Sequence, residues 1–139
     1  MPVAYLTRRE RFSSAHRLFK PDLTDEENFE LYGQCSHPNW HGHNYQLFVT
    51  IKGEINDTTG YVLNLKHLSE LIKKEIIEKV DHKNLNVDVD FLSGIIPSTE
   101  NIAVFIWNKL KNPIKNLGAE IHRVKIQETE NNYVEYFGE

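Results

Sequence analysis

The segment from Cys35 to Val49, CSHPNWHGHNYQLFV, gathers several groups that bind metals or act as nucleophiles. It holds the only cysteine of the chain and three of its seven histidines. His41 and His43 are separated by one residue, so in an extended segment both imidazoles project from the same face. Two neutral imidazoles on one face suit two ligands of a single zinc ion. Two exposed histidines at the entrance of a strand are the alternative interpretation.

His16 is the candidate for a third ligand, because it ends an alternating segment near the start of the chain. A neighbouring strand would bring it opposite His41 and His43. Three histidines without a fourth protein ligand leave one position open for water or substrate, which is typical of catalytic rather than structural zinc. A surface or hydrogen-bonded histidine is the other interpretation of His16.

Cys35 lies six residues before His41 in a polar, turn-like segment, which favours an exposed thiol over a small buried apolar side chain. A nearby zinc ion or imidazolium would lower its pKa and make a thiolate available as a base or nucleophile. Asp81 and His82 are adjacent just beyond a predicted helix. They form either a helix C-terminus with a favourable cation or a proton-relay pair.

The elements that must position these groups follow from the hydrophobic pattern. Alternation predicts strands at about 3–15, 45–52 and 120–128, a short strand near 61–63, and a hairpin partner in NNYVEYF. Amphipathic spacing predicts two helices, 64–80 after an Asn64 cap and 97–111 after Ser98 or Thr99. A shorter helix is predicted between Thr24 and Gly33. Long antiparallel strands with two amphipathic helices indicate an α+β fold, with the helices covering one sheet face.

Composition restricts the class of protein. The chain of 139 residues is expected to form a single domain over 1–139, and its net charge of -4 argues against a nucleic-acid partner. No apolar run approaches the ~18 residues of a membrane span, and the first residues contain no apolar core of a secretory signal. One cysteine cannot form an internal disulfide. These features predict a cytoplasmic protein.

Six motifs along the chain resemble, in order and spacing, the 6-pyruvoyltetrahydropterin synthase family: FSSAHRL, GQCSHPNWHGHNY, GYVLNL, DHKNL, STENIAVFIW and IQETENN. The resemblance implies the tunnelling fold, an antiparallel four-stranded sheet carrying two helices. It also implies a homohexamer, in which the sheets of each trimer close into a barrel and two trimers stack. Such closure would remove the exposed edges of the sheet.

The resemblance also implies roles for individual residues. Zinc would be held by His16, His41 and His43. Catalysis would rest on Cys35, Asp81 and His82, with the last two serving the zinc of a neighbouring chain. Glu128 would anchor the pterin, and Thr99 and Glu100 would lie near the pterin pocket. Two positions depart from the family pattern: Trp40, where glycine is more frequent, and His37, an additional histidine.

The implied enzyme is a zinc-dependent lyase that converts 7,8-dihydroneopterin triphosphate to 6-pyruvoyltetrahydropterin and triphosphate in tetrahydrobiopterin biosynthesis. Mg²⁺ is expected with the triphosphate, and Arg17, next to His16, is the candidate cation for binding it. The alternative is 6-carboxytetrahydropterin synthase, in which three residues typically separate the cysteine from HGH, rather than the five intervening residues found here. A non-catalytic zinc protein that binds pterins is a further alternative, although binding alone requires neither Cys35 nor the Asp81–His82 pair.

Overall fold

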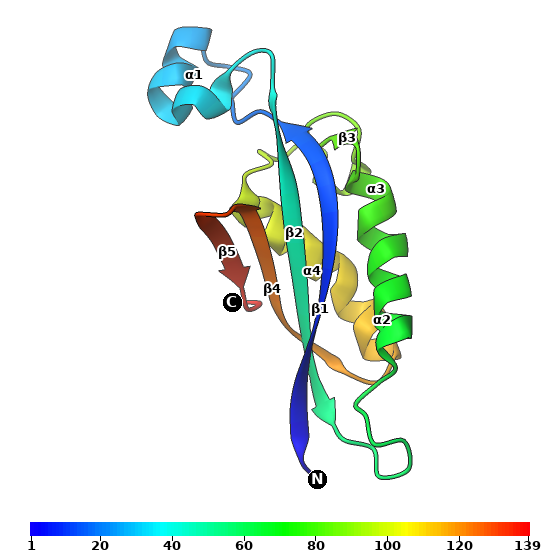
Figure 1. Cartoon of the computed structure of the whole chain (residues 1–139). Coiled ribbons are helices and arrows are strands. Elements are labelled where there is room, and N and C mark those ends of the chain that lie inside the picture. Colours follow the sequence, from blue (N-terminus) through cyan, green and yellow to red (C-terminus); the bar gives the residue numbers. More distant parts are fainter.

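The computed structural model describes residues 1–139 and shows a twisted five-stranded sheet with helices packed on one face (Figure 1). The strands lie in the order β3-β1-β2-β4-β5. Their bounds are β1 (Val3–His16), β2 (His41–Glu54), β3 (Lys83–Asn84), β4 (Glu120–Thr129) and β5 (Asn132–Tyr136). All neighbouring strands are antiparallel except β1 and β3.

The β1–β2 pair forms the centre of the sheet and sets the position of the site. The two strands pair along their whole length, from Val3 opposite Glu54 to His16 opposite His41. Alternation along both strands sends one set of side chains to the helices, among them Phe12 and Tyr45, which are 2% and 0% exposed. A shift of one residue would expose this apolar set, so the core fixes the register that brings His16 beside His41.

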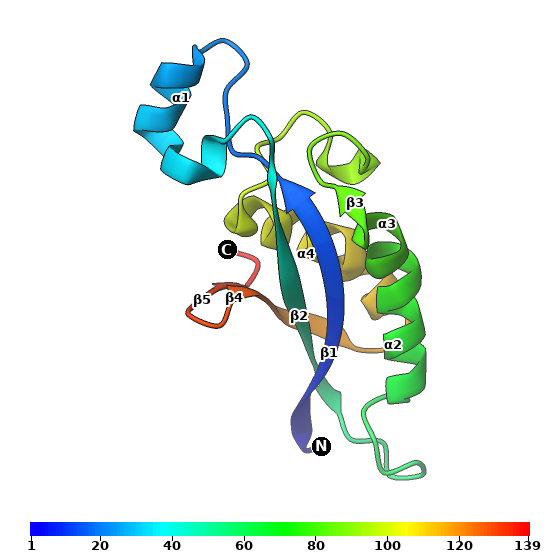
Figure 2. The same ribbon diagram turned by 45° about the horizontal axis from the view of Figure 1, so that its top comes forward.

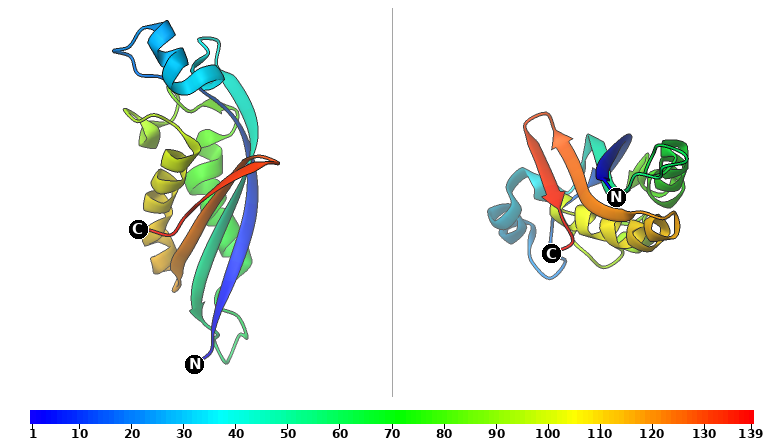
Figure 3. Two further views of the ribbon diagram at one scale, coloured as in Figure 1. Left: turned by 90° about the vertical axis from the view of Figure 1, so that its left-hand side faces the viewer. Right: turned by 90° about the horizontal axis from the view of Figure 1, so that it is seen from below.

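Two long helical segments cover the inner face of the sheet (Figure 3). The first is continuous from α2 (Leu65–Ile72) through a π-helical turn (Lys73–Ile77) to α3 (Glu78–Val80), and the second is α4 (Thr99–Asn116). Their apolar stripes pack on the inner faces of β1, β2 and β4 to form a core of 22 buried residues. No helix combines the length and the apolar character that crossing a membrane requires.

Helix α1 (Asp25–Tyr32) lies beyond the end of the sheet and outside these two layers (Figure 2). It begins with the predicted capping box, in which Thr24 and Glu27 bond each other's backbone amides. It ends at Gly33, which has a positive φ of 62°. Asn28 is its only buried residue, so this helix is held by hydrogen bonds rather than by an apolar face.

Two expectations about the strands are wrong in detail. The sheet has a fifth strand, because residues beyond α3 run parallel to β1 and exchange backbone bonds with it: His82 N–H with Ser13 O at 2.6 Å, and Leu85 N–H with Ala15 O at 2.8 Å. The two paired residues of β3 are too few to show alternation. Residues 61–63 form bends instead of a strand, with Leu63 packed into the core.

Helix α4 also extends past the predicted end at residue 111, through Pro113 to Asn116. Proline removes one backbone donor, which costs about 3 kcal/mol in a helix interior. Leu110 and Ile114, which flank this point, are both 0% exposed. Their burial continues the apolar stripe and offsets the lost hydrogen bond.

Candidate active site

Three histidines meet at the end of the β1–β2 ladder nearest α1. His16 is the last residue of β1 and lies opposite His41, the first residue of β2, and His43 follows two residues later on the same face. One ring nitrogen from each lies within 4.8 Å of the others. The strands therefore bring together the three histidines that the sequence suggested as metal ligands.

The hydrogen bonds of these rings leave nitrogen lone pairs free inside the cluster. Nδ1 of His16 lies 2.8 Å from the carbonyl oxygen of Pro97, so it carries the proton and donates it there, which leaves Nε2 as the basic nitrogen. Nδ1 of His41 and Nε2 of His43 are buried without any hydrogen-bond partner. Buried polar atoms of this kind are rare in proteins, and three convergent imidazoles fit a divalent cation.

The surroundings of His16 and His41 favour the neutral form of the imidazole, which is the form that binds metals. Burial lowers the pKa of His16, and the hydrogen bond to Pro97 only partly opposes this effect. Burial likewise lowers the pKa of His41, helped by the neighbouring His43. Metal binding requires deprotonated imidazole, so the site is prepared for a cation near neutral pH.

Tyr45 forms the floor of the cluster. Its ring stacks on Phe12 with centroids 4.8 Å apart, and it meets the rings of His16 and His43 edge-on at 6.0 and 5.5 Å. The hydroxyl is 3.3 Å from Nε2 of His16. Burial raises the pKa of Tyr45 well above its usual range, so the phenol keeps its proton. Sequence reasoning missed this residue, although it continues the same-face series of His41 and His43.

Glu128 brings a carboxylate to the edge of the cluster. The β4–β5 pairing is irregular between Gln127 and Thr129, and such a bulge re-aims the side chain that it contains. One carboxylate oxygen, Oε1, lies 3.4 Å from Nε2 of His43, and the hydroxyl of Thr99 donates to the other. The side chain of Glu128 is 25% exposed, so it is open to a ligand from one side.

The start of α4 holds several of these groups in place. Pro97 accepts the bond from His16, Ser98 caps the helix by accepting from the Asn101 amide at 3.1 Å, and Thr99 bonds Glu128. Thr99 is buried, whereas Glu100, one residue further, is exposed. Sequence reasoning did not anticipate the carbonyl of Pro97, because a backbone contact leaves no signal in residue type.

Cys35 lies in a short 3-10 helix (Gly33–Ser36) between α1 and β2, where its carbonyl accepts a bond from the Leu18 amide at 2.7 Å. The residue is partly buried. Burial raises the pKa of the Cys35 thiol, and the charge of Glu128 raises it further. The sequence suggested a lowered pKa only with a zinc ion or imidazolium nearby, so a thiolate at Cys35 requires positive charge that opposes burial and Glu128.

Arg17 is engaged within the chain. Its Nε donates to the carbonyl oxygen of Ser36 at 2.7 Å, its guanidinium lies 4.1 Å above the ring of Phe19, and Nη2 is 3.3 Å from Asp25. Its side chain is only 12% exposed. These contacts tie the end of β1 to the segment that carries Cys35.

The two departures from the expected pattern lie in the segment between the 3-10 helix and β2. Trp40 has a φ of 66°, an uncommon value for a bulky residue, and its ring meets Phe19 edge-on at 6.3 Å. His37 is exposed and accepts a bond from the Asn39 amide at Nδ1. It is not one of the three histidines whose nitrogens converge.

Asp81 and His82 form a pair outside the cluster. Asp81 accepts the Ser13 amide at 2.8 Å through Oδ1 and lies 3.0 Å from Nδ1 of His82 through Oδ2. The Ser13 amide, together with His82, lowers the pKa of Asp81. The side chain of His82 is 83% exposed and lines a shallow surface pocket of about 500 Å³, which His43 also borders. Within one chain this imidazole has no ligand-sized enclosure.

Known proteins resemble this chain over nearly its whole length. The family model described as 6-pyruvoyl tetrahydropterin synthase matches residues 5–139. The human 6-pyruvoyl tetrahydrobiopterin synthase is 45% identical over 98% of this chain and 92% of that protein. The protein of the same name from Dictyostelium discoideum is 48% identical over 96% of each chain.

Solved structures agree with this similarity. The 6-pyruvoyl tetrahydropterin synthase of Caenorhabditis elegans superposes with a TM-score of 0.92 at 37% identity, covering 100% of this chain and 98% of that one. The Plasmodium vivax structure of that name, with a TM-score of 0.68 at 19% identity over 98% of both chains, shares the fold. This chain belongs to the 6-pyruvoyl tetrahydropterin synthase family.

Proposed function

We propose that this protein is a zinc-dependent lyase that converts 7,8-dihydroneopterin triphosphate to 6-pyruvoyltetrahydropterin and triphosphate, a step of tetrahydrobiopterin biosynthesis. The observation that carries the proposal is the convergence of three histidine nitrogens beside the carboxylate of Glu128. The names of close relatives support the same activity. The reaction needs no external oxidant, because the side chain loses the two hydrogens that the ring gains.

Zinc is the metal that we propose for the cluster. His16 would bind through Nε2, since Nδ1 is used by Pro97, and the unpartnered Nδ1 of His41 and Nε2 of His43 would complete the set. When bound, the metal would act as a Lewis acid toward oxygens of the ligand side chain. Three protein ligands leave a position open, as in catalytic zinc sites.

Pterin binding is assigned to Glu128. A carboxylate offers two acceptor oxygens to the paired N–H groups of an aminopyrimidine edge, which fixes orientation as well as affinity. The bond from Thr99 to Oε2 would hold the carboxylate in one rotamer before the ligand arrives. Glu100, exposed on the first turn of α4, would border the same pocket.

Proton transfer is assigned to Cys35, Asp81 and His82. Cys35 would take a proton from a side-chain carbon, and a cation at the histidine cluster would oppose the rise in its pKa caused by burial and Glu128. His82, oriented by Asp81, would handle the complementary transfer while the triphosphate leaves with the electrons of its C–O bond. Because His82 is exposed, we assign it to the zinc site of a neighbouring chain.

This assignment requires an oligomer, and we propose the homohexamer of two stacked trimers with barrels formed by their sheets. The sheet supports it, because β1 pairs with β3 only at Ser14 and Ala15 and exposes the rest of its outer edge. Long unpaired edges invite further strands, and barrel closure would remove them. The outer face of the sheet, which no helix covers, would line the barrel (Figure 3).

The remaining parts of the proposal concern the triphosphate and the cell. Mg²⁺ is expected to accompany the triphosphate. Arg17 would contribute positive potential, but its contacts with Ser36 and Asp25 make it an indirect contributor rather than a free phosphate clamp. We propose a cytoplasmic protein whose residues 1–139 act as one domain.

The test is an assay of purified protein with 7,8-dihydroneopterin triphosphate, with products identified by mass. We expect inorganic triphosphate and a pteridine that keeps its three-carbon side chain. The His43→Ala variant serves as the control for contaminating activity. Acetaldehyde together with a 6-carboxy pteridine would instead assign the chain to 6-carboxytetrahydropterin synthase activity, and binding without turnover would indicate a non-catalytic pterin protein.

A further inference from the structure

The phenol of Tyr45 is a buried polar group at the floor of the cluster, and none of the proposed roles uses it. The residue is 0% exposed, and its hydroxyl lies 3.3 Å from Nε2 and 3.4 Å from Nδ1 of His16. The hydrogen-bonding directions of the two imidazole nitrogens diverge, so an oxygen almost equally distant from both lies along neither direction. The hydroxyl is therefore near a partner without being well bonded to it.

A cation bound to the cluster would leave the Tyr45 hydroxyl without an acceptor on His16. Nδ1 donates to Pro97, so Nε2 is the only lone pair of the ring that Tyr45 could use. A cation held by the three histidines would take that lone pair. A phenol is an O–H donor at neutral pH, and leaving a buried donor without an acceptor is unfavourable.

The other groups of the site do not replace that acceptor. The hydroxyl of Tyr45 makes no hydrogen bond outside His16, and Glu128 is held by Thr99 at Oε2 and lies beside His43 at Oε1. A ligand that binds at the open position beside the histidines would bring an acceptor oxygen within reach of this hydroxyl. The proposed substrate carries such oxygens on its side chain at carbon 6 of the pterin.

We propose that the Tyr45 hydroxyl donates a hydrogen bond to a side-chain oxygen of the bound pterin, which makes Tyr45 a specificity-determining residue for pterins with an oxygenated substituent at carbon 6. This inference rests on the proposed function. Glu128 recognises the ring and Tyr45 recognises the substituent, so the two groups select different parts of one ligand. A site that bonds a ligand hydroxyl discriminates against the analogue that lacks it, because its own donor is then left unpaired.

A purely structural role for Tyr45 makes a different prediction. Its ring meets His16 and His43 edge-on and stacks on Phe12, so the ring alone supports the ligands from below. Tyr45→Phe keeps that ring and removes only the hydroxyl. Phe12→Leu keeps the hydroxyl and weakens the support beneath it.

The experiment measures binding of two probes to zinc-loaded protein by calorimetry: neopterin, with a trihydroxypropyl side chain, and 6-methylpterin, without side-chain oxygen. For Tyr45→Phe we expect about tenfold weaker binding of neopterin, since one hydrogen bond contributes about 1.4 kcal/mol. Binding of 6-methylpterin should change by less than about twofold, and zinc content should stay near one per chain. Tyr61→Phe, in an exposed loop, is the matched control.

Several outcomes would overturn the inference. Equal weakening for both probes, or loss of zinc in Tyr45→Phe, would assign the hydroxyl to support of the histidines. Unchanged binding of neopterin would show that the hydroxyl meets no ligand oxygen. Phe12→Leu should lower the melting temperature without selective loss of neopterin, and selective loss there would point to packing instead. Wild-type protein that binds neither probe would overturn the proposed function, and this inference with it.

Discussion

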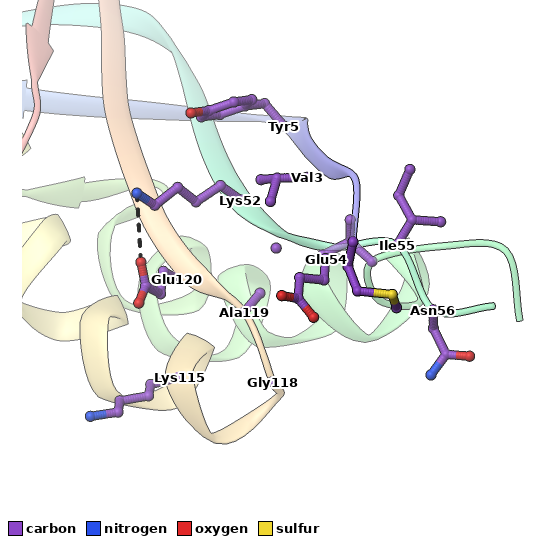
Figure 4. Close-up of a pocket in the computed structure, with 13 residues that line it drawn as sticks. Val3, Tyr5, Lys52, Glu54, Ile55, Asn56, Lys115, Gly118, Ala119 and Glu120 are labelled. Atoms are coloured by element: carbon purple, nitrogen blue, oxygen red, sulfur yellow. Dashed lines mark ion pairs between the residues drawn. The ribbon is translucent and has the colours of Figure 1, made fainter. Parts of the chain in front are cut away.

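The two ends of the β1–β2 ladder offer a direct comparison, because each has an opening but only one has convergent chemistry. The end that carries the N-terminus has the larger pocket, about 910 Å³, lined by Met1, Val3, Tyr5 and neighbouring residues (Figure 4). One ion pair joins two of its charged residues, Lys52 and Glu120, at 3.7 Å. The opposite end holds the histidine cluster.

The difference lies in how polar groups are satisfied. At the N-terminal end, Lys52 and Glu120 are 40% and 72% exposed, so water completes their bonding and an ion pair there contributes little to stability. At the histidine end, two buried nitrogens and a poorly bonded phenol have no such solvent. Unsatisfied groups that converge indicate a ligand site better than cavity size does.

The largest expected effect is at a proposed ligand. His43→Ala should lower zinc from about one per chain to less than about one tenth, with loss of turnover, because two remaining histidines form an incomplete site. Metal analysis after gel filtration measures this, and Lys52→Ala at the opposite end is the control. Full zinc in both variants would place the metal elsewhere.

Cys35→Ala should follow in size. It should retain zinc and its oligomeric state but lose on the order of 10²–10⁴ in turnover, the range for a positioned acid or base. The backbone bond from Leu18 to the carbonyl of Cys35 survives the change, which limits structural effects. Turnover close to that of the wild type would transfer the proton step to another group, and His37 would be tested next.

Glu128→Ala should cost roughly 2–4 kcal/mol of pterin binding, by analogy with truncated buried polar partners. Zinc content should be unchanged, because Glu128 lies outside the converging nitrogens. Calorimetry compares it with Glu130→Ala, an exposed carboxylate two residues away. Similar losses in both variants would indicate a general charge effect rather than an anchor at the histidine end.

The buried histidines of the cluster should make the stability of the protein depend on pH. Burial lowers the pKa of His16 and His41 below 6.5, so the unfolded chain binds more protons than the folded chain just below that pH. Stability of chelator-treated protein should therefore rise with pH through this window and fall as the pH drops below 6.5. Urea denaturation at several pH values measures this slope.

The control for that slope is His67→Gln, which changes an exposed histidine of α2. It should keep the slope, whereas His16→Gln should reduce it. Asp81 acts in the same direction at lower pH, because the Ser13 amide lowers its pKa below 3.8 and protonation weakens that bond. Identical slopes in the wild type and His16→Gln would contradict the burial argument.

The smallest effect is expected at the opposite end. Lys52→Met removes the exposed ion pair with Glu120 and should change the free energy of unfolding by less than about 0.5 kcal/mol. Zinc content and turnover should match the wild type. Thermal denaturation and the product assay together test this, and a large loss of turnover would give the larger pocket a functional role that its exposed ion pair does not suggest.

Much of the secondary structure can be predicted from the sequence, because an element with one buried face shows a regular spacing of apolar residues. The long strand ending at His16 and the helices capped at Asn64 and Ser98 follow from that pattern. The spacing of His41 and His43 predicts a shared face. Pairing His16 with them depends on which strands are neighbours, and local periodicity carries no information on that point.

Other features depend on tertiary contacts that residue types do not encode. The bulge that contains Glu128 and the bond of His16 to the carbonyl of Pro97 both depend on backbone geometry. Burial and the charge of Glu128 both raise the pKa of the Cys35 thiol, and neither effect can be predicted from the residues next to Cys35 in the sequence. The exposure of His82 could not be predicted from its position next to Asp81. The strand that follows has only two residues, too few for an alternating pattern that would separate buried from exposed side chains.

The three bonded residues at the start of α4 constrain the length of the chain in this region. Pro97 contacts β1, Thr99 contacts β4, and Ser98 between them begins the helix. Consecutive Cα atoms are about 3.8 Å apart, more than a hydrogen bond can stretch, so one residue added or deleted among these three would detach His16 or Glu128. Natural or engineered insertions should therefore be tolerated only earlier, around the exposed Ser93 and Gly94.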